Sequence, residues 1–403
     1  LFMKELVEEG KVSESQLDAA VRRILHVKFE LGLFDDPYRY SDESRKEEVL
    51  LSDAHREAAR DIARKSMVLL KNEANTLPFS KEVKTVAVIG PLGKSQKDMI
   101  GTWQAQGEGK HAISLVQGLE NVLPDAKIVY AKGCDIEGED KSGFDKALNT
   151  ARKADIIIAA VGESAMMSGE AHSRLNIDIP GVQQELVLEL AKLNKPLAVA
   201  LFNGRPLVLT ELQENENVPA ILETWLAGTE AGNAIADVLF GDYNPSGKLP
   251  VTFPYHLGQT PIFYAHKHTG RPKSQDRYTS KYIDGPNAPL YPFGHGLSYT
   301  TFDIGAPSLS SKTLEDGQTL EVSVTVKNTG KRKGKETVQL YTRDLVASVT
   351  RPVKQLQAFR QIELEPGQEK TVKFKLSHGN FAFYNRDWQY VTEPGTIKVF
   401  AGS

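Results

Sequence analysis

The 403-residue sequence contains one cysteine, Cys134, and no long apolar run. A single cysteine excludes an intramolecular disulfide and a cysteine-rich metal site. It is compatible with the cytosol and equally with a bacterial periplasm. Because no apolar stretch approaches the roughly 20 residues that cross a bilayer, we expect no membrane partner.

The chain also lacks an excess of charge of either sign. It has 49 Lys and Arg against 52 Asp and Glu, a formal net charge of −3. Such a balance gives no support to a nucleic-acid partner. The chain begins at Leu1-Phe2-Met3 without an initiator methionine or a signal peptide. We therefore expect it to be a piece of a longer protein, and the sequence does not indicate the cellular location of that protein.

Residues 1–66 are predicted to be helices and a linker. Ser13 and Gln16 form a capping box, and apolar residues recur behind them at helical spacing up to Gly32. Residues 1–40 have too little apolar surface to form a domain alone, so we expect them to pack on a segment upstream. Residues 41–51 are charged and without periodicity, which predicts a linker, and Ser52 caps a first helix to about Lys65.

Residues 67–253 alternate between apolar runs and helical patterns. The runs lie at 66–70, 85–90, 128–130, 155–161, 196–201 and 220–225, and the helical patterns at 143–153, 181–193, 206–213 and 230–240. Alternation of this kind predicts an α/β sandwich, a largely parallel sheet covered by helices.

The pattern changes twice after residue 253. Residues 254–298 are rich in Pro, Gly, His and Tyr without periodicity, which predicts a long connecting segment. Residues 299–403 show short alternating runs at 320–326, 338–341, 356–360, 371–376 and 396–400, which predict an antiparallel β-sandwich. Trp388 is expected to lie in the core of that sandwich.

The best catalytic candidates lie in the polar loop that follows the apolar run 155–161. Ligands of open α/β sheets bind beyond the carboxyl ends of the strands. Glu170 follows Gly169 and could donate a proton, although a loop glutamate without function fits equally well. Glu163 is the rival candidate. His172 and Arg174 could bind sugar hydroxyls or hold the loop by an ion pair.

No cofactor or metal site is predicted. Gly90 follows a strand, but the spacing matches no phosphate-binding loop, and Pro91 removes an amide that an anion would need. The sequence contains no HExxH and no GxSxG motif. In the connecting segment, Arg271 and Tyr282 suit either a sugar ring or a protein interface.

Three motifs stand out in the sequence: 203–206, NGRP; 228–254, GTEAGNAIADVLFGDYNPSGKLPVTFP; and 291–299, YPFGHGLSY. They resemble glycoside hydrolase family 3, in the order of that family, and most closely its bacterial periplasmic β-glucosidases. Since some bacterial members of the family are dimers, the resemblance also allows a homodimer that uses Arg271 and Tyr282. The resemblance covers essentially the whole chain. It implies an upstream (β/α)8 barrel domain, of which residues 1–40 resemble the last helices, then the α/β sandwich, then a fibronectin type III-like domain.

The resemblance also implies retaining hydrolysis of terminal β-D-glucosyl residues, as in cellobiose, in the periplasm or outside the cell. The nucleophile would be an aspartate of the barrel, upstream of Leu1, and Ser168-Gly169-Glu170 matches the context of the family's acid/base. The chain alone would then be incomplete and inactive. A β-xylosidase or another exo-glycosidase remains open, as does a non-catalytic carbohydrate-binding or assembly module.

Overall fold

The computed structural model describes residues 2–403, which divide into two compact units between residues 56 and 57. The first unit contains α1 (Met3–Glu8), α2 (Glu14–Glu30) and α3 (Ser44–Val49). The predicted capping box of Ser13 and Gln16 is present at the start of α2. The short helix α3 lies inside the stretch predicted to be a linker; Lys, Glu and Arg have high helix propensity, which a search for apolar periodicity does not register.

The second unit begins within α4 (Asp53–Ser66) and is built on a six-stranded sheet of order β1-β6-β5-β4-β2-β3. All neighbouring pairs are parallel except β1 with β6. The predicted largely parallel sheet is therefore confirmed. The strands are β1 (Val68–Asn72), β2 (Thr85–Ile89), β3 (Lys127–Ala131), β4 (Ile156–Gly162), β5 (Leu197–Phe202) and β6 (Ala220–Glu223).

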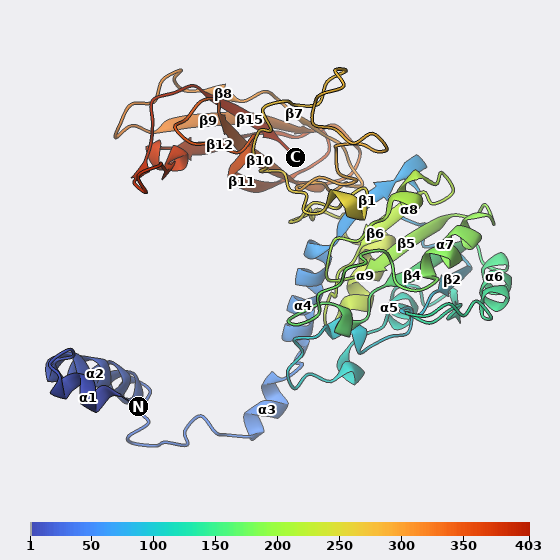
Figure 1. Ribbon diagram of the computed structural model, residues 1–403. Coiled ribbons are helices and arrows are strands. Elements are labelled where there is room, and N and C mark those ends of the chain that lie inside the picture. The colour runs from blue at the N-terminus through green and yellow to red at the C-terminus, as the bar shows by residue number, and fades with distance from the viewer. Residues whose placement is uncertain (1) are drawn as a thin grey trace. The chain divides into compact units, whose positions relative to one another are not determined.

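Helices cover both faces of this sheet (Figure 1). One apolar core joins residues of α4, α5 (Leu115–Val122) and α9 (Ala231–Leu239) to one face. The other core joins α6 (Phe144–Arg152), α7 (Gln183–Ala191) and α8 (Thr210–Glu214) to the opposite face. Every residue of β4 and β5 is buried, as expected for central strands of a parallel sheet. Helix α5 was not among the predicted helices.

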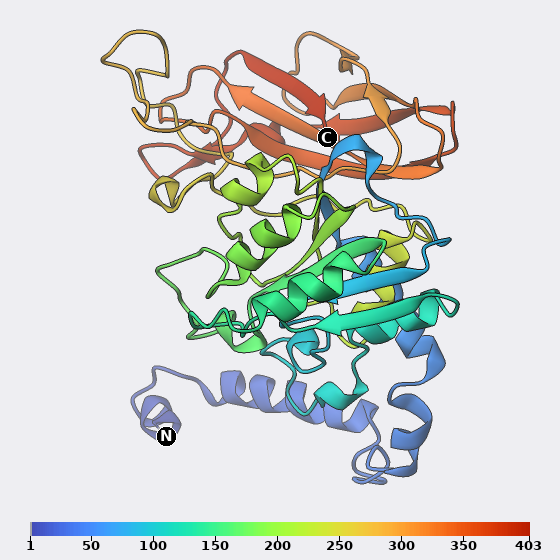
Figure 2. The same ribbon diagram turned by 90° about the vertical axis from the view of Figure 1, so that its right-hand side faces the viewer.

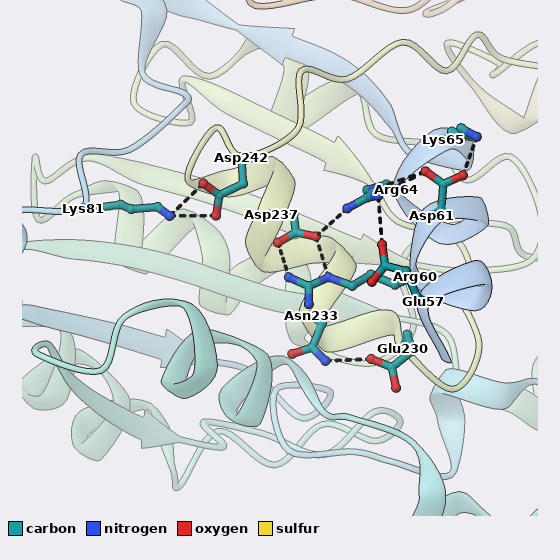
Figure 3. Close-up of polar contacts among 10 residues, drawn as sticks. All are labelled: Glu57, Arg60, Asp61, Arg64, Lys65, Lys81, Glu230, Asn233, Asp237 and Asp242. Atoms are coloured by element: carbon teal, nitrogen blue, oxygen red, sulfur yellow. Dashed lines mark hydrogen bonds and ion pairs between the residues drawn. The ribbon is translucent and has the colours of Figure 1, made fainter. Parts of the chain in front are cut away.

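Charged side chains fasten α4 to α9 (Figure 3). The carboxylate of Asp237, which is 2% exposed, accepts hydrogen bonds from Arg60 Nε at 2.7 Å and from Arg60 Nη2 at 2.5 Å. Arg64 Nη1 lies 3.5 Å from the same carboxylate, and Arg64 Nη2 pairs with Glu57 and Asp61 on its own helix. This fork-to-fork geometry fixes the orientation of α4 on the α/β domain.

The chain ends in an antiparallel β-sandwich, drawn at the top of Figure 2. One sheet has the order β11-β10-β15, and the other the order β12-β9-β7, with β8 on β9. Strand β9 alternates between buried and less buried residues, as the sequence predicts, and its apolar side chains fill the core between the sheets. The strands are β7 (Phe302–Ile304), β8 (Ser308–Leu309), β9 (Leu320–Asn328), β10 (Gly334–Asp344), β11 (Gln355–Leu364), β12 (Glu369–Leu376), β13 (Phe383–Tyr384), β14 (Tyr390–Val391) and β15 (Ile397–Gly402).

Trp388 corrects one expectation about the sandwich. It lies in the turn between β13 and β14 with φ 59° and is 83% exposed, so it is not a core residue. The Asn385 side chain shapes this turn by accepting the backbone N–H groups of Asp387 and Gln389. A turn so constrained can present a large side chain outward.

The segment 254–298 connects the α/β domain and the sandwich and contacts both. Tyr264 stacks on Phe293 at 4.5 Å between ring centroids and meets Tyr341 of β10 edge-on at 5.7 Å. Nearby, Lys248 forms a largely buried ion pair with Glu336 of β10 at 2.8 Å. The short 3-10 helices of the chain are 73–75, 98–100, 109–111, 165–167, 257–259 and 378–381.

Candidate active site

The candidate site lies at the carboxyl ends of β4, β5 and β6, where Glu163, Asn203 and Glu223 end or follow neighbouring strands. Gly162 closes β4 with φ 137°, and a Cβ there would lie 1.8 Å from the carbonyl oxygen of Phe202. Only glycine permits this close approach of β4 and β5. The tight fit sets the direction in which Glu163 leaves the sheet.

Glu163 is fully buried and surrounded by cationic groups. Arg174 Nη1 donates to Glu163 Oε1 at 2.6 Å, and Arg205 Nε lies 2.8 Å from the same oxygen as an ion pair without hydrogen-bond geometry. The backbone N–H of Gly204 donates to Oε2 at 3.4 Å. These partners make Glu163 an anchor for two arginines and leave it no exposed face for a substrate.

Glu223 is a second buried carboxyl in the same layer. Its Oε1 accepts the backbone N–H of Trp225 at 2.9 Å and its Oε2 accepts Asn203 Nδ2 at 3.0 Å. Burial raises the pKa of Glu223 to about 8, the two hydrogen bonds oppose that rise, and the charge of Glu163 adds to it. Glu223 is therefore mostly protonated at neutral pH, which lowers the cost of burying two carboxyls side by side.

The loop that carries Glu170 is held on both sides of this residue. The Thr102 hydroxyl contacts the carbonyl oxygens of Ala165 and, at 2.6 Å, Ser168. Arg205 Nη2 donates to the carbonyl oxygens of Met167 and, at 2.9 Å, His172. In addition, Ser168 Oγ donates to the carbonyl of Gly204 at 3.1 Å. The backbone from 165 to 172 is thus tied to the ends of the sheet.

The side chain of Glu170 projects from this fixed backbone into solvent. Gly169 has φ 132° and Ala171 φ 60°, so the chain turns sharply at the residue. The His172 Nδ1–H donates to the Glu170 carbonyl at 2.5 Å. Within residues 2–403 no hydrogen bond or ion pair engages the Glu170 carboxylate.

The structure brings four of the predicted site residues together and leaves two apart. Glu163, Glu170, His172 and Arg174 share one loop and its supports. Arg271 and Tyr282 belong to the connecting segment, where the Arg271 carbonyl accepts Ser280 N–H at 2.9 Å and the Tyr282 hydroxyl donates to the Gly258 carbonyl at 3.4 Å. In the described part of the chain, no hydrogen bond or ion pair joins either of them to the Glu170 loop.

Sequence reasoning missed several supports of this site. Arg205 was noted as part of a motif but not as the residue that holds the loop, and Glu223 was not singled out. Trp103 follows Thr102 directly and is 73% exposed, which places an open aromatic face next to a residue that binds the loop backbone. An aromatic residue after Gly101 in a stretch without periodicity was the available signal.

No group of three or more His, Cys, Asp or Glu side chains in residues 2–403 is arranged to hold a metal ion. No helix in the same range has the length and hydropathy needed to cross a bilayer.

Comparison with known proteins identifies the α/β domain and the β-sandwich. Residues 67–299 match the glycosyl hydrolase family 3 C-terminal domain, and residues 336–403 match the fibronectin type III-like domain. The chain is 45% identical to a periplasmic beta-glucosidase of Salmonella typhimurium, covering 100% of this chain and 56% of that protein. It is 41% identical to a beta-xylosidase of Formosa agariphila, covering 100% of this chain and 55% of that protein.

The fold agrees with these similarities. A beta-glucosidase from Listeria innocua, solved in complex with isofagomine, superposes with a TM-score of 0.91 at 42% identity, over 99% of this chain and 55% of that one. The chain therefore spans about half the length of the relatives it matches. It belongs to glycoside hydrolase family 3 and comprises the family's C-terminal domain followed by a fibronectin type III-like domain.

Proposed function

We propose that the chain is the C-terminal portion of a retaining β-glucosidase and supplies its proton-transfer group, Glu170. Its relative from Salmonella typhimurium is named a periplasmic beta-glucosidase, which supports a terminal β-D-glucosyl substrate and a periplasmic or secreted location. The nucleophile would be an aspartate of an upstream barrel domain, the partner against which this portion docks.

The observation that carries the proposal is an exposed carboxyl on a fixed backbone. Arg205, Thr102 and Ser168 hold the loop at 165–172, whereas the Glu170 side chain is free of protein partners among the described residues. A general acid must reach the glycosidic oxygen at a defined position. The hydrogen bonds to the loop backbone fix the position of Glu170, and its exposed side chain can contact the glycosidic oxygen of a substrate.

Glu163 is proposed to position this loop and not to transfer the proton. Its carboxylate is fully buried and engaged by Arg174 and Arg205, and Arg205 in turn binds the loop backbone on both sides of Glu170. Loss of Glu163 would therefore act on activity through Arg205. His172 and Arg174, predicted to bind sugar, are proposed to act mainly on the loop in the same way.

The chemistry follows from two carboxyl groups on opposite sides of the scissile bond. In a retaining enzyme they stand roughly 5–5.5 Å apart. Glu170 would protonate the leaving oxygen while the aspartate attacks the anomeric carbon, and would then deprotonate the water that releases the sugar. Because one group lies on each domain, the chain alone is expected to be inactive. Trp103 is proposed to stack on a sugar ring near Glu170.

A β-xylosidase is the second candidate, because the Formosa agariphila relative is named a beta-xylosidase at 41% identity. A non-catalytic binding module is the third. Arg271 and Tyr282 remain proposed sugar or homodimer contacts on the connecting segment, to be tested by Arg271→Ala through both KM and oligomeric state.

The test combines the chain with its barrel portion and assays nitrophenyl β-D-glucoside and β-D-xyloside. We expect turnover of the glucoside only in the combined protein. Glu170→Gln should lower kcat by about 10²–10⁴-fold, the usual contribution of general acid–base catalysis. With Glu170→Ala, azide should restore turnover and give a β-configured glycosyl azide.

Glu163→Gln serves as the matched control, because it makes the same chemical change seven residues away. It should lower activity, and a Glu163→Ala variant should not be rescued by azide. Azide rescue of a Glu163→Ala variant, and not of Glu170→Ala, would move the acid/base assignment to Glu163. Faster hydrolysis of the xyloside would select the second candidate, and cellobiose binding without any turnover would select the third.

A further inference from the structure

The β-sandwich has a cleft of about 450 Å³ that the proposed reaction does not use. It lies where β10 ends at Asp344 and the chain runs through 345–350 toward Arg351. Three arginines line it, Arg343, Arg351 and Arg386, together with His268 from the connecting segment. Its volume falls in the range of sites for small molecules and short oligomers.

The three arginines have few protein partners. Within the described chain no hydrogen bond or ion pair engages the side chain of Arg343 or Arg386. Arg351 is 13% exposed, and its Nε is buried without a hydrogen-bond partner. Its Nη2 donates to Gln355 at 2.9 Å. The buried Nε of Arg351 is out of reach of a ligand, so the arginines open to an acceptor from outside are Arg343 and Arg386.

The acidic groups nearby do not neutralise this cluster. Asp344 stands 4.0 Å from Arg351 Nε, and its Oδ1 accepts the Val346 N–H at 3.2 Å. Glu393 also acts on Arg351, and its Oε2 accepts the Ser348 N–H at 2.8 Å. Two carboxylates, each bonded to backbone, face three guanidinium groups. The cleft therefore retains positive charge, which favours an anionic ligand.

Exposed aromatic residues adjoin the cleft on the β13–β14 hairpin. Tyr384 and Tyr390 are cross-strand partners with ring centroids 5.1 Å apart and exposures of 61% and 62%. Trp388 stands 83% exposed in the turn.

Two arginines link this hairpin to the cleft. Arg386 lies between Tyr384 and Trp388 in the chain and lines the cleft. The Arg351 guanidinium covers the ring of Phe383 at 4.2 Å. Arg386 and Trp388 are thus two residues apart on the exposed turn of this hairpin, at the edge of the cleft.

We propose that this surface, called here the arginine–aromatic cleft, binds an oligosaccharide that carries carboxylate groups. Guanidinium forks match carboxylates, and aromatic faces pack against the C–H faces of sugar rings. A symmetric contact between two copies of the chain would bring the same guanidinium groups together, since an isologous interface pairs a patch with itself. That like-charge contact is unfavourable. The cleft is a second sugar site, independent of hydrolysis at Glu170.

The test uses isothermal titration calorimetry on the full 403-residue chain with tri-galacturonate as the acidic probe and cellotriose as the neutral one. We expect tri-galacturonate to bind with a Kd of about 1 mM or lower and cellotriose to bind at least about tenfold more weakly. Added salt should weaken the binding of the acidic probe, because ions screen the charges. Arg386→Ala and Trp388→Ala should each weaken it about tenfold. Both side chains are exposed, so these variants should fold.

Arg152→Ala, an exposed arginine on α6, is the matched control and should leave binding unchanged. The proposal is overturned if tri-galacturonate does not bind, or if cellotriose binds as tightly. Equal binding of a hexaglutamate peptide would assign the cleft to acidic protein segments instead. A change from dimer to monomer on Trp388→Ala in light scattering would assign the surface to contact between copies. None of these outcomes depends on whether the chain hydrolyses β-glucosides.

Discussion

Arg174 Nη1 lies 2.6 Å from Glu163 Oε1, and this contact joins the end of a central strand to the far end of the loop that carries Glu170. Glu163 directly follows the sheet strand β4, and Arg174 follows Glu170 by four residues. The loop is thus closed on itself by a buried ion pair. Since Arg205 binds the same carboxylate oxygen, one buried anion organises two arginines.

Removal of the Arg174 guanidinium should therefore destabilise the fold. Arg174→Gln leaves Glu163 with Arg205 alone, and we expect the free energy of unfolding to fall by about 2 kcal/mol, less than the full cost of an unpaired buried charge. Urea denaturation of the 403-residue chain measures this. Arg152→Gln, on the surface of α6, is the control. Equal stability of the two variants would show that the ion pair does not hold the loop.

The buried carboxyl of Glu223 should make stability depend on pH. Its pKa is about 8 in the folded state against 4.5 as its ordinary value. Between these values the folded chain keeps a proton that the unfolded chain has lost. This contribution to stability is complete below about pH 4.5 and is lost as the pH rises to about 8, by at most about 1.4 kcal/mol per pH unit.

Glu223→Gln should flatten this slope because the amide stays neutral. Asn203 Oδ1 has no hydrogen-bond partner among the described residues, so its amide can turn to accept the new N–H₂ group. Denaturation at intervals from pH 5 to 8 tests the prediction, with exposed Glu120→Gln as control. An unchanged slope in Glu223→Gln would mean that Glu223 is ionised in the folded chain.

The bidentate pair of Arg60 and Asp237 should be important for stability (Figure 3). Asp237→Ala leaves Arg60 without its partner, whose hydrogen bond raises the pKa of Arg60. We expect a loss of about 3 kcal/mol in unfolding free energy, at the lower end for a broken buried pair because Arg60 remains partly exposed. Asp242→Ala, which removes an exposed pair with Lys81, should cost less than about 1 kcal/mol. Similar losses in both would contradict the prediction.

Gly162 should tolerate no side chain. In Gly162→Ala the new Cβ would lie 1.8 Å from the Phe202 carbonyl oxygen at φ 137°, so β4 and β5 must separate. We expect a loss of more than about 4 kcal/mol and little soluble protein. Gly285→Ala, which adds a methyl group in open space, should express normally. Soluble Gly162→Ala protein with an unchanged thermal midpoint would refute the requirement for glycine.

The sequence by itself determined the secondary structure of those segments in which apolar residues form a continuous run or alternate regularly. The buried runs 155–161 and 196–201 became β4 and β5, and the alternation at 320–326 became β9, because apolar side chains must share one face or both faces of a strand. Helix α3 has no apolar period and was therefore not predicted. Helix α5 was also not predicted, although Ser114 and Gln117 form a capping box and Leu115 and Leu119 recur at helical spacing. Ser168-Gly169-Glu170 pointed to the loop, although its catalytic role stays a prediction.

Only the tertiary structure decided which of the two glutamates is buried and holds the loop, and which one is exposed to solvent. In the sequence Glu163 and Glu170 are two carboxyls seven residues apart. In the fold, Arg205 from the next strand end and Arg174 from the loop bury Glu163, while Glu170 faces solvent. Trp388 was likewise expected inside and lies outside. Burial and ion pairing depend on residues that are distant in the chain, so local pattern does not encode them.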